Sequence, residues 1–188
     1  MSTHRNTYIP PEEYLAIERR AEYKSEYVDG VMYAMAGGTE RHNLIVANVI
    51  IAIGGQLRGR HCRVYPSDLK IRVPNSKRFF YPDVSVVCGE TQFSDEEKDV
   101  VLNPTLIVEV LSESTAGYDR GTKFFSYQQI ESLRECLLIS QDQPLIEHFV
   151  RQTEDDWLYR KISGTGERIQ LPSIECELRV SDVYDKAT

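Results

Sequence analysis

Two carboxylic acids occur within apolar, β-prone stretches of this sequence. Asp83 stands between Tyr81-Pro82 and the run at residues 84–87, and Glu109 interrupts the run at residues 106–111. An ionised carboxylate in such a run is costly unless a cation or hydrogen-bond donors compensate it. Hard divalent cations take oxygen ligands, polarise phosphate and lower the pKa of a bound water. The two acids therefore predict a metal-dependent site for phosphodiester hydrolysis.

Each acid taken alone has a second interpretation, because a buried carboxylate can simply pair with Arg or Lys, or stand at the end of a strand. Two features favour a site over such pairing: there are two acids on two apolar strands, and polar segments follow them. These segments are Ser112-Glu113-Ser114-Thr115 and Tyr118-Asp119-Arg120-Gly121-Thr122-Lys123-Phe124.

Strands must position these acids. β-rich segments are expected at residues 62–73, 79–88, 106–111 and 136–139, and the last could lie beside the strand of Glu109 in a mixed sheet. Asp29-Gly30 between two β-prone runs predicts an N-terminal hairpin. Residues 145–151 and 157–162 predict a C-terminal hairpin, in which Trp157 packs or presents an aromatic face.

Three helices are expected around these strands. Residues 10–19 begin with Pro and acids, and residues 119–130 form the third helix. Between them, Thr39 can cap a helix that runs through Leu57 and ends where Gly54, Gly55 and Gly59 loosen the chain. The order predicts an α/β (mixed α+β) fold, with a central mixed sheet flanked by helices, in one domain spanning residues 1–188.

The composition limits the classes of partner and compartment. A net charge of −7 argues against a broad basic surface for nucleic acid, so any DNA contact must be local. Four single cysteines without metal-ligand spacing are expected to be unpaired in a reducing cytoplasm. Residues 1–7 carry no apolar signal segment, and no run is long enough to span a membrane. Gly37-Gly38 lacks phosphate-loop spacing, which argues against a nucleotide cofactor.

Six blocks of the sequence together resemble the Uma family of bacterial endonucleases, within the PD-(D/E)XK restriction-endonuclease-like superfamily. The blocks are residues 81–88 (YPDVSVVC), 104–115 (PTLIVEVLSEST), 119–124 (DRGTKF), 27–30 (YVDG), 34–37 (AMAG) and 42–43 (HN). The resemblance implies a restriction-endonuclease-like core, a DNA substrate and a Mg²⁺ cofactor for which Mn²⁺ can substitute. Asp83 and Glu109 are then the motif acids, and the Val110 carbonyl joins them in holding the metal.

One position departs from the superfamily pattern, because Leu111 stands where a Lys is expected two residues after Glu109. Lys123, on the following helix, is the candidate replacement that would orient the attacking water and stabilise charge on the phosphate. Its alternative interpretation is a solvated Lys on a helix face, and Lys70 is the rival candidate.

Three further residues have open roles. Asp68 could supply a third carboxylate from the strand before Asp83, or be an acid at a strand start. Glu26 could be a metal ligand or an outer hydrogen-bonding partner. His42 could bind metal, contact phosphate or support a structural polar network, and the structural interpretation is slightly favoured.

Two rival functions remain beside the nuclease. The first is a catalytically silent nuclease-fold module for DNA binding or protein interaction, which the acidic composition and Leu111 favour. The second is metal-dependent hydrolysis of a substrate other than nucleic acid. Because a double-strand cut needs two sites, a homodimer is expected, with the late hairpin or an exposed strand as its contact.

Overall fold

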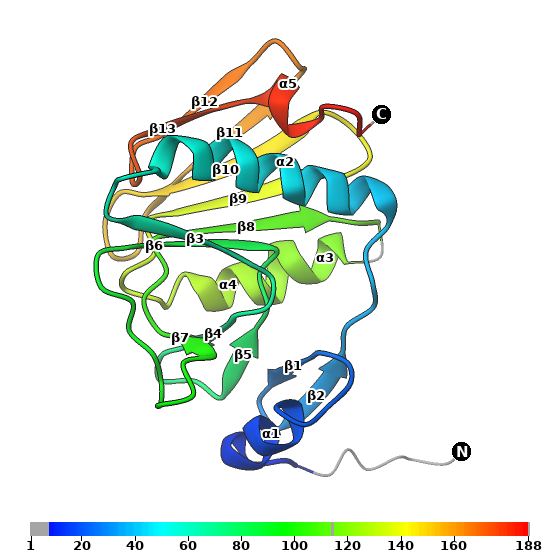
Figure 1. Ribbon diagram of the computed structural model, residues 1–188, viewed down its shortest axis with the longest axis vertical. Helices are drawn as coiled ribbons and strands as arrows, with labels where there is room; N and C mark the ends of the chain where they lie inside the picture. The colour runs from blue at the N-terminus through cyan, green and yellow to red at the C-terminus, as the bar shows by residue number, and fades with distance from the viewer. Residues whose placement is uncertain (1–7, 114, 188) are drawn as a thin grey trace.

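The structure is a computed structural model that describes residues 8–113 and 115–187. Residues 1–7, where no signal segment is expected, lie outside the described residues, as do Ser114 of the 104–115 block and Thr188. Helices pack against mixed β-sheets, as Figure 1 shows, and this confirms the expected fold class. No helix within the described residues is long and apolar enough to cross a membrane.

The larger sheet holds both strands that matter for the two acids. Its order is β11 (Trp157–Ser163), β10 (Leu145–Arg151), β9 (Glu135–Ser140), β8 (Leu106–Leu111), β6 (Val84–Cys88) and β3 (Cys62–Pro66). β8 pairs parallel with β9 and antiparallel with β6, which confirms a mixed sheet with the two predicted strands side by side. β10 and β11 form the predicted C-terminal hairpin.

The smaller sheet contains the predicted N-terminal hairpin. Its order is β2 (Val31–Ala34), β1 (Ser25–Val28), β5 (Arg78–Phe80), β4 (Lys70–Val73) and β7 (Val100–Val101). Asp29 and Gly30, at the turn between β1 and β2, have φ angles of 50° and 102°. This left-handed backbone is the one that an Asp-Gly hairpin turn requires. A separate ribbon pairs β12 (Arg168–Leu171) with β13 (Cys176–Arg179).

Helices cover both faces of the larger sheet (Figure 1). The helical segments are α1 (Pro11–Glu18), α2 (Glu40–Leu57), α3 (Ala116–Tyr118), the π-helical η1 (Asp119–Lys123), α4 (Phe124–Tyr127) and α5 (Val180–Val183). Thr39 caps α2 as expected, because its side chain accepts the backbone N–H of His42 at 3.1 Å. The helix ends at Leu57, two residues before Gly59, as expected, and Gly54 and Gly55 lie within its last turn.

The two faces of β8 carry different cores. Leu106, Val108 and Val110 pack toward α2 and the β12–β13 ribbon. Ile107 and Leu111 pack toward α4 and the smaller sheet. Because side chains alternate along a strand, Glu109 points to the same side as Ile107 and Leu111. The acid therefore lies between the larger sheet and the helical segment that carries Lys123.

Two expected strands are each divided between the sheets. Residues 62–73 form β3 in the larger sheet and β4 in the smaller one, and residues 79–88 form β5 and β6 in the same divided way. Pro66 ends β3, and Pro82 lies between β5 and β6. Proline cannot donate a ladder hydrogen bond, so both positions suit a crossing between sheets. Asp83 lies at one of these crossings, directly before β6.

The expected helix at residues 119–130 is wrong in its bounds and its type. Helical structure begins at Ala116, passes through the π-helical η1 and ends at Tyr127. A π turn widens a helix by one residue per hydrogen-bonded ring and often occurs at functional sites.

The expectation of four unpaired cysteines is also wrong. Cys62 and Cys88 face each other across β3 and β6 and form a disulfide, whereas Cys136 and Cys176 are free and buried. The pairing depends on the register of two antiparallel strands. Four cysteines that stand singly along the chain do not reveal this register.

Candidate active site

Lys123 lies at the centre of a buried group of acids. Its Nζ is 2.8 Å from Glu26 Oε1, 3.2 Å from Glu109 Oε1 and 3.5 Å from Asp119 Oδ1. These side chains come from β1, β8 and η1, and each is at most 7% exposed. One ammonium thus faces three carboxylates in a place that water hardly reaches.

The π-helical η1 turns two of these residues inward. Asp119 and Lys123 are buried at its two ends, while Arg120, Gly121 and Thr122 between them are exposed. Tyr127, four residues after Lys123, is fully buried and donates its hydroxyl to Glu109 Oε1 at 2.6 Å. Residues 119, 123 and 127 therefore form one inward-facing row beneath β8.

Glu109 is compensated on one oxygen only. Lys123 and Tyr127 both contact Oε1, and among the described residues no hydrogen bond reaches Oε2. Burial raises the pKa of Glu109 to about 8, against the lowering effect of Lys123, and Asp83 and Asp119 raise it further. The carboxyl group thus lies where additional positive charge would favour its ionised form.

Asp83 joins this group at the end of β8. Its Oδ2 accepts the backbone N–H of Val110 at 2.7 Å, and its Oδ1 lies 3.1 Å from His42 Nε2. The hydrogen bond with Asp83 is the largest cause that raises the pKa of His42, and a hydrogen bond to the Val110 backbone adds to it. The N-terminal turn of α2 thereby places His42 against both Asp83 and Val110.

The structure brings together most residues singled out from the sequence. Lys123 and Glu26 meet Glu109, and His42 and Val110 meet Asp83. Lys123 is buried in this ion cluster, so its alternative interpretation as a solvated Lys is wrong.

Asp68 and Lys70 lie outside the group. Asp68 is in the turn after β3, its side chain is 84% exposed, and it pairs with Lys24 at 3.0 Å. This exposed pairing on the surface favours the other interpretation of Asp68, an acid near a strand end that pairs with a Lys. Lys70 is buried on β4, where it contacts Asp99 at 2.8 Å and the Tyr81 hydroxyl at 3.3 Å.

Two members of the cluster were not singled out from the sequence. Asp119 lies within the block at residues 119–124 without a predicted role, and no sequence pattern assigns a role to Tyr127. Their spacing of four residues on either side of Lys123 is a signal that could have found them, because such positions share one side of a helix.

The donor atoms of the site are of the types that a hard divalent cation takes, although within the described residues no three of its carboxylate and imidazole groups lie within 4.8 Å of one another. Asp83 and Glu109 supply carboxylate oxygens and Val110 a backbone carbonyl, which are the ligands that Mg²⁺ and Mn²⁺ take. Four acids, Glu26, Asp83, Glu109 and Asp119, share this region with Lys123 and His42. Because the acids outnumber the cationic groups in a poorly solvated place, an added cation would offset their repulsion.

Comparison with known proteins gives a consistent picture. Residues 11–181 match the Uma2 family, whose description is "Putative restriction endonuclease". Two relatives from Synechocystis sp. are "Uncharacterized protein slr1290", 37% identical over 94% of this chain and 91% of the relative, and "Uncharacterized protein sll1609", 35% identical over 85% and 90%. A solved structure from Anabaena variabilis, described as "a putative nuclease belonging to DUF820", has a TM-score of 0.78 at 16% identity and covers 96% of this chain and 99% of its own. At that identity the solved structure shows a shared fold.

Proposed function

Since this chain belongs to the Uma2 family, we propose that it is an endonuclease that hydrolyses DNA phosphodiester bonds with Mg²⁺, or with Mn²⁺ as a substitute. The observation that carries the proposal is the buried Lys123 beside Glu109 on β8, with the Asp83 carboxylate bound to the backbone N–H of the next residue, Val110. Two acids and one Lys at the end of a β-sheet are the groups that metal-assisted phosphodiester hydrolysis needs.

In the proposed mechanism, Asp83, Glu109 and the Val110 carbonyl would hold the cation. A bound Mg²⁺ would polarise the phosphate and lower the pKa of a water. The Val110 N–H fixes one oxygen of Asp83 and His42 contacts the other, so the carboxylate is already oriented before a cation binds. Tyr127 orients the Glu109 carboxylate in the same way, by donating its hydroxyl to Oε1. Oε2 of Glu109 receives no hydrogen bond from the described residues.

Lys123 supplies the positive charge that the strand lacks. Leu111 points to the same side of β8 as Glu109, so a Lys at that position would reach the site from the strand. Leu111 packs instead in the apolar cluster with Phe124, and the ammonium arrives from η1. Its roles are to orient the attacking water and to stabilise negative charge that develops on the phosphate.

Cleavage of supercoiled plasmid by the purified chain tests this proposal. We expect nicking with Mg²⁺ or Mn²⁺, no nicking with EDTA, and no nicking by Asp83→Ala. The matched control is Asp68→Ala, which removes an acid from an exposed turn and should cleave like the wild type. Cleavage that survives Asp83→Ala at an undiminished rate would contradict the assignment.

A specific observation favours a second candidate, the catalytically silent module. Both oxygens of Asp83 already have protein partners, and Lys123 contacts Glu26, Glu109 and Asp119 at once, so the acids are partly neutralised without a metal. Isothermal titration with Mn²⁺ separates the candidates. Binding that Asp83→Ala abolishes and Asp68→Ala retains supports the nuclease, and no binding in the millimolar range supports the module.

A further inference from the structure

A second group of potential metal ligands lies at the far end of β6 from Asp83. Cys62 and Cys88 are directly opposite in the β3–β6 pair, with their Cα atoms 3.9 Å apart. The next pair outward is hydrogen-bonded, because the Gly89 N–H donates to the His61 carbonyl at 3.0 Å. Cys62 and Cys88 are therefore a non-hydrogen-bonded pair, the position at which opposite side chains of antiparallel strands are closest.

His61 completes this group. One ring nitrogen of His61 and the two sulfurs all lie within 4.8 Å of one another, and within the described chain no other three His, Cys, Asp or Glu side chains do so. Thiolate sulfur and imidazole nitrogen are the ligands that Zn²⁺ prefers. Because tetrahedral Zn²⁺ binds sulfur at about 2.3 Å and nitrogen at about 2.0 Å, its ligand atoms stand roughly 3.5–3.8 Å apart. Reduced sulfurs at this position need small movements to reach such spacing.

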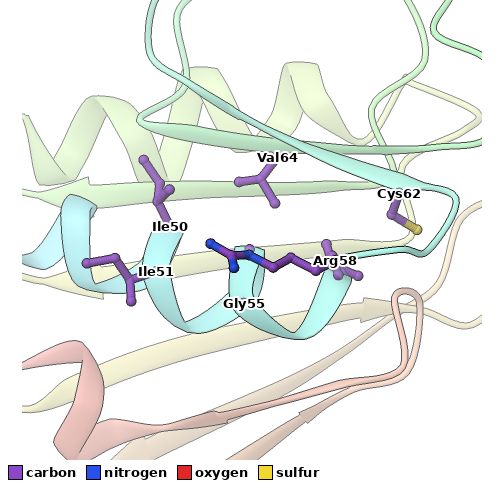
Figure 2. Close-up of a pocket in the computed structure, with 8 residues that line it drawn as sticks. Ile50, Ile51, Gly55, Arg58, Cys62 and Val64 are labelled. Atoms are coloured by element: carbon purple, nitrogen blue, oxygen red, sulfur yellow. The ribbon is translucent and has the colours of Figure 1, made fainter.

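The group is accessible from solvent. His61 is exposed and Cys88 is half-buried, while Cys62 is 6% exposed. Cys62 also lines a hollow of about 510 Å³ between α2 and β3, and Figure 2 shows its sulfur at the end of this hollow, beyond Arg58. His61 lines a second hollow with Arg63 and Glu90. A cation can thus reach three protein ligands and keep a water as its fourth.

We infer that His61, Cys62 and Cys88 form a binding site for a thiophilic divalent cation such as Zn²⁺ once the disulfide is reduced. A dithiol reductant transfers two electrons and two protons to the sulfurs and is itself oxidised to a disulfide. The metal then replaces the two thiol protons, which pass to solvent. The disulfide and the metal-bound dithiolate are alternative states of the same two sulfurs.

This site is separate from the candidate active site. β6 begins beside Asp83 and ends at Cys88, and five residues of strand span about 17 Å. Its ligands are nitrogen and sulfur, whereas those around Asp83 are oxygen, so the two places select different metals. Zinc bound here is therefore not the metal of phosphodiester hydrolysis, and this inference stands whether or not the chain cleaves DNA.

Cobalt spectroscopy tests the site directly. The chain is reduced with dithiothreitol, freed of it under anaerobic conditions and titrated with Co²⁺, which shows thiolate ligands by sulfur-to-metal charge-transfer absorption. We expect these bands to saturate at one Co²⁺ per chain, to disappear when Zn²⁺ is added, and to be absent from the oxidised chain. Reduced wild-type chain that gives no thiolate bands overturns the inference.

Three variants assign the ligands. Cys88→Ser should weaken binding by more than the roughly tenfold to hundredfold that loss of an outer partner costs. His61→Ala, at an exposed position where folding is not at risk, should weaken binding and keep the charge-transfer bands of two thiolates. Cys176→Ser is the control, because this free cysteine lies beside Arg60 and outside the group. If His61→Ala binds like the wild type, or Cys176→Ser abolishes the bands, the proposed ligand set is wrong.

Discussion

Two buried glutamates on neighbouring parallel strands, Glu109 on β8 and Glu135 on β9, are compensated in different ways. Glu135 is fully buried, its Oε1 lies 2.7 Å from His148 Nε2, and its Oε2 accepts both the backbone N–H and the hydroxyl of Ser173. Glu109 has two donors on Oε1, with none from the described residues on Oε2. Both carboxylate oxygens of Glu135 thus have hydrogen-bond partners, whereas only Oε1 of Glu109 does within the described residues.

The surroundings of the two acids differ as well. Glu135 is level with Leu106 and points to the α2 side of the sheet, where its partners are neutral donors and a histidine. Glu109 points to the opposite side, where Glu26 and Asp119 share its Lys123. Burial of an acid in a sheet is therefore no sign of a site by itself. An unused oxygen and a surplus of nearby acids distinguish Glu109 from an acid that the fold has already satisfied.

The largest contrast is expected in DNA cleavage. Glu109→Gln should lower the rate of plasmid nicking by roughly 1000-fold, because it removes the charge that holds the cation at the scissile phosphate. Glu135→Gln, which keeps a side chain of the same shape, should cleave at the wild-type rate per folded molecule. Nicking assays on both variants, corrected for the folded fraction, measure this difference. Equal losses per folded molecule in the two variants would mean that Glu109 has no role in cleavage that the satisfied Glu135 lacks.

In the free energy of unfolding, substitution of Glu135 should cost more than substitution of Glu109. Glu135→Ala leaves His148 and two Ser173 donors without their acceptor inside the protein, at a cost of about 3 kcal/mol in the free energy of unfolding. Glu109→Gln replaces a carboxyl group that burial keeps protonated up to about pH 8 in the absence of metal, so its change should be below about 1 kcal/mol. Urea denaturation followed by circular dichroism gives both values. A larger loss in Glu109→Gln would show that the Lys123 cluster is a structural ion network.

Lys123 sharpens the comparison further, because it contacts Glu109 and has no counterpart beside Glu135. Lys123→Met should lower cleavage by roughly 100-fold, because the phosphate loses a cationic partner. Its Mn²⁺ affinity should not fall, because Glu26, Glu109 and Asp119 then lose their competing cation. The control is Lys70→Met. It removes a buried Lys that pairs with Asp99 and makes no ion pair with Glu26, Glu109 or Asp119. A parallel fall in Mn²⁺ affinity and cleavage in Lys123→Met would argue that Lys123 only organises the fold.

The two glutamates also show how far the sequence alone could lead. Glu109 was found because it interrupts an apolar run, which is a local signal. Glu135 stands at the first residue of its strand and carries no such local signal, since its partners His148 and Ser173 come from later in the chain. Local signals likewise predicted the Asp-Gly hairpin and the Thr39 cap, both of which the structure confirms.

What the sequence did not predict depends on contacts between distant segments. The Cys62–Cys88 disulfide follows from the β3–β6 register, and the division of residues 62–73 and 79–88 between two sheets follows from how those sheets pack. Glu26 meets Lys123 only because β1 lies under η1 in the folded chain. The π-helical η1 has no simple sequence mark, although the four-residue spacing of Asp119, Lys123 and Tyr127 fits the one side of the helical segment that they share.

The last expected effect is a pH dependence of the stability that Glu109 should cause. Burial raises its pKa from the ordinary value of 4.5 to about 8, so between these values the folded chain keeps a proton that the unfolded chain has released. Its contribution to stability is therefore present below pH 4.5 and is lost as the pH rises to 8, by at most about 1.4 kcal/mol per pH unit. Urea denaturation in EDTA should show this decline in the wild type, and Glu109→Gln should lack it. If the two stability curves run parallel from pH 5 to 8, Glu109 is already ionised in the folded chain and Lys123 compensates it as fully as His148 and Ser173 compensate Glu135.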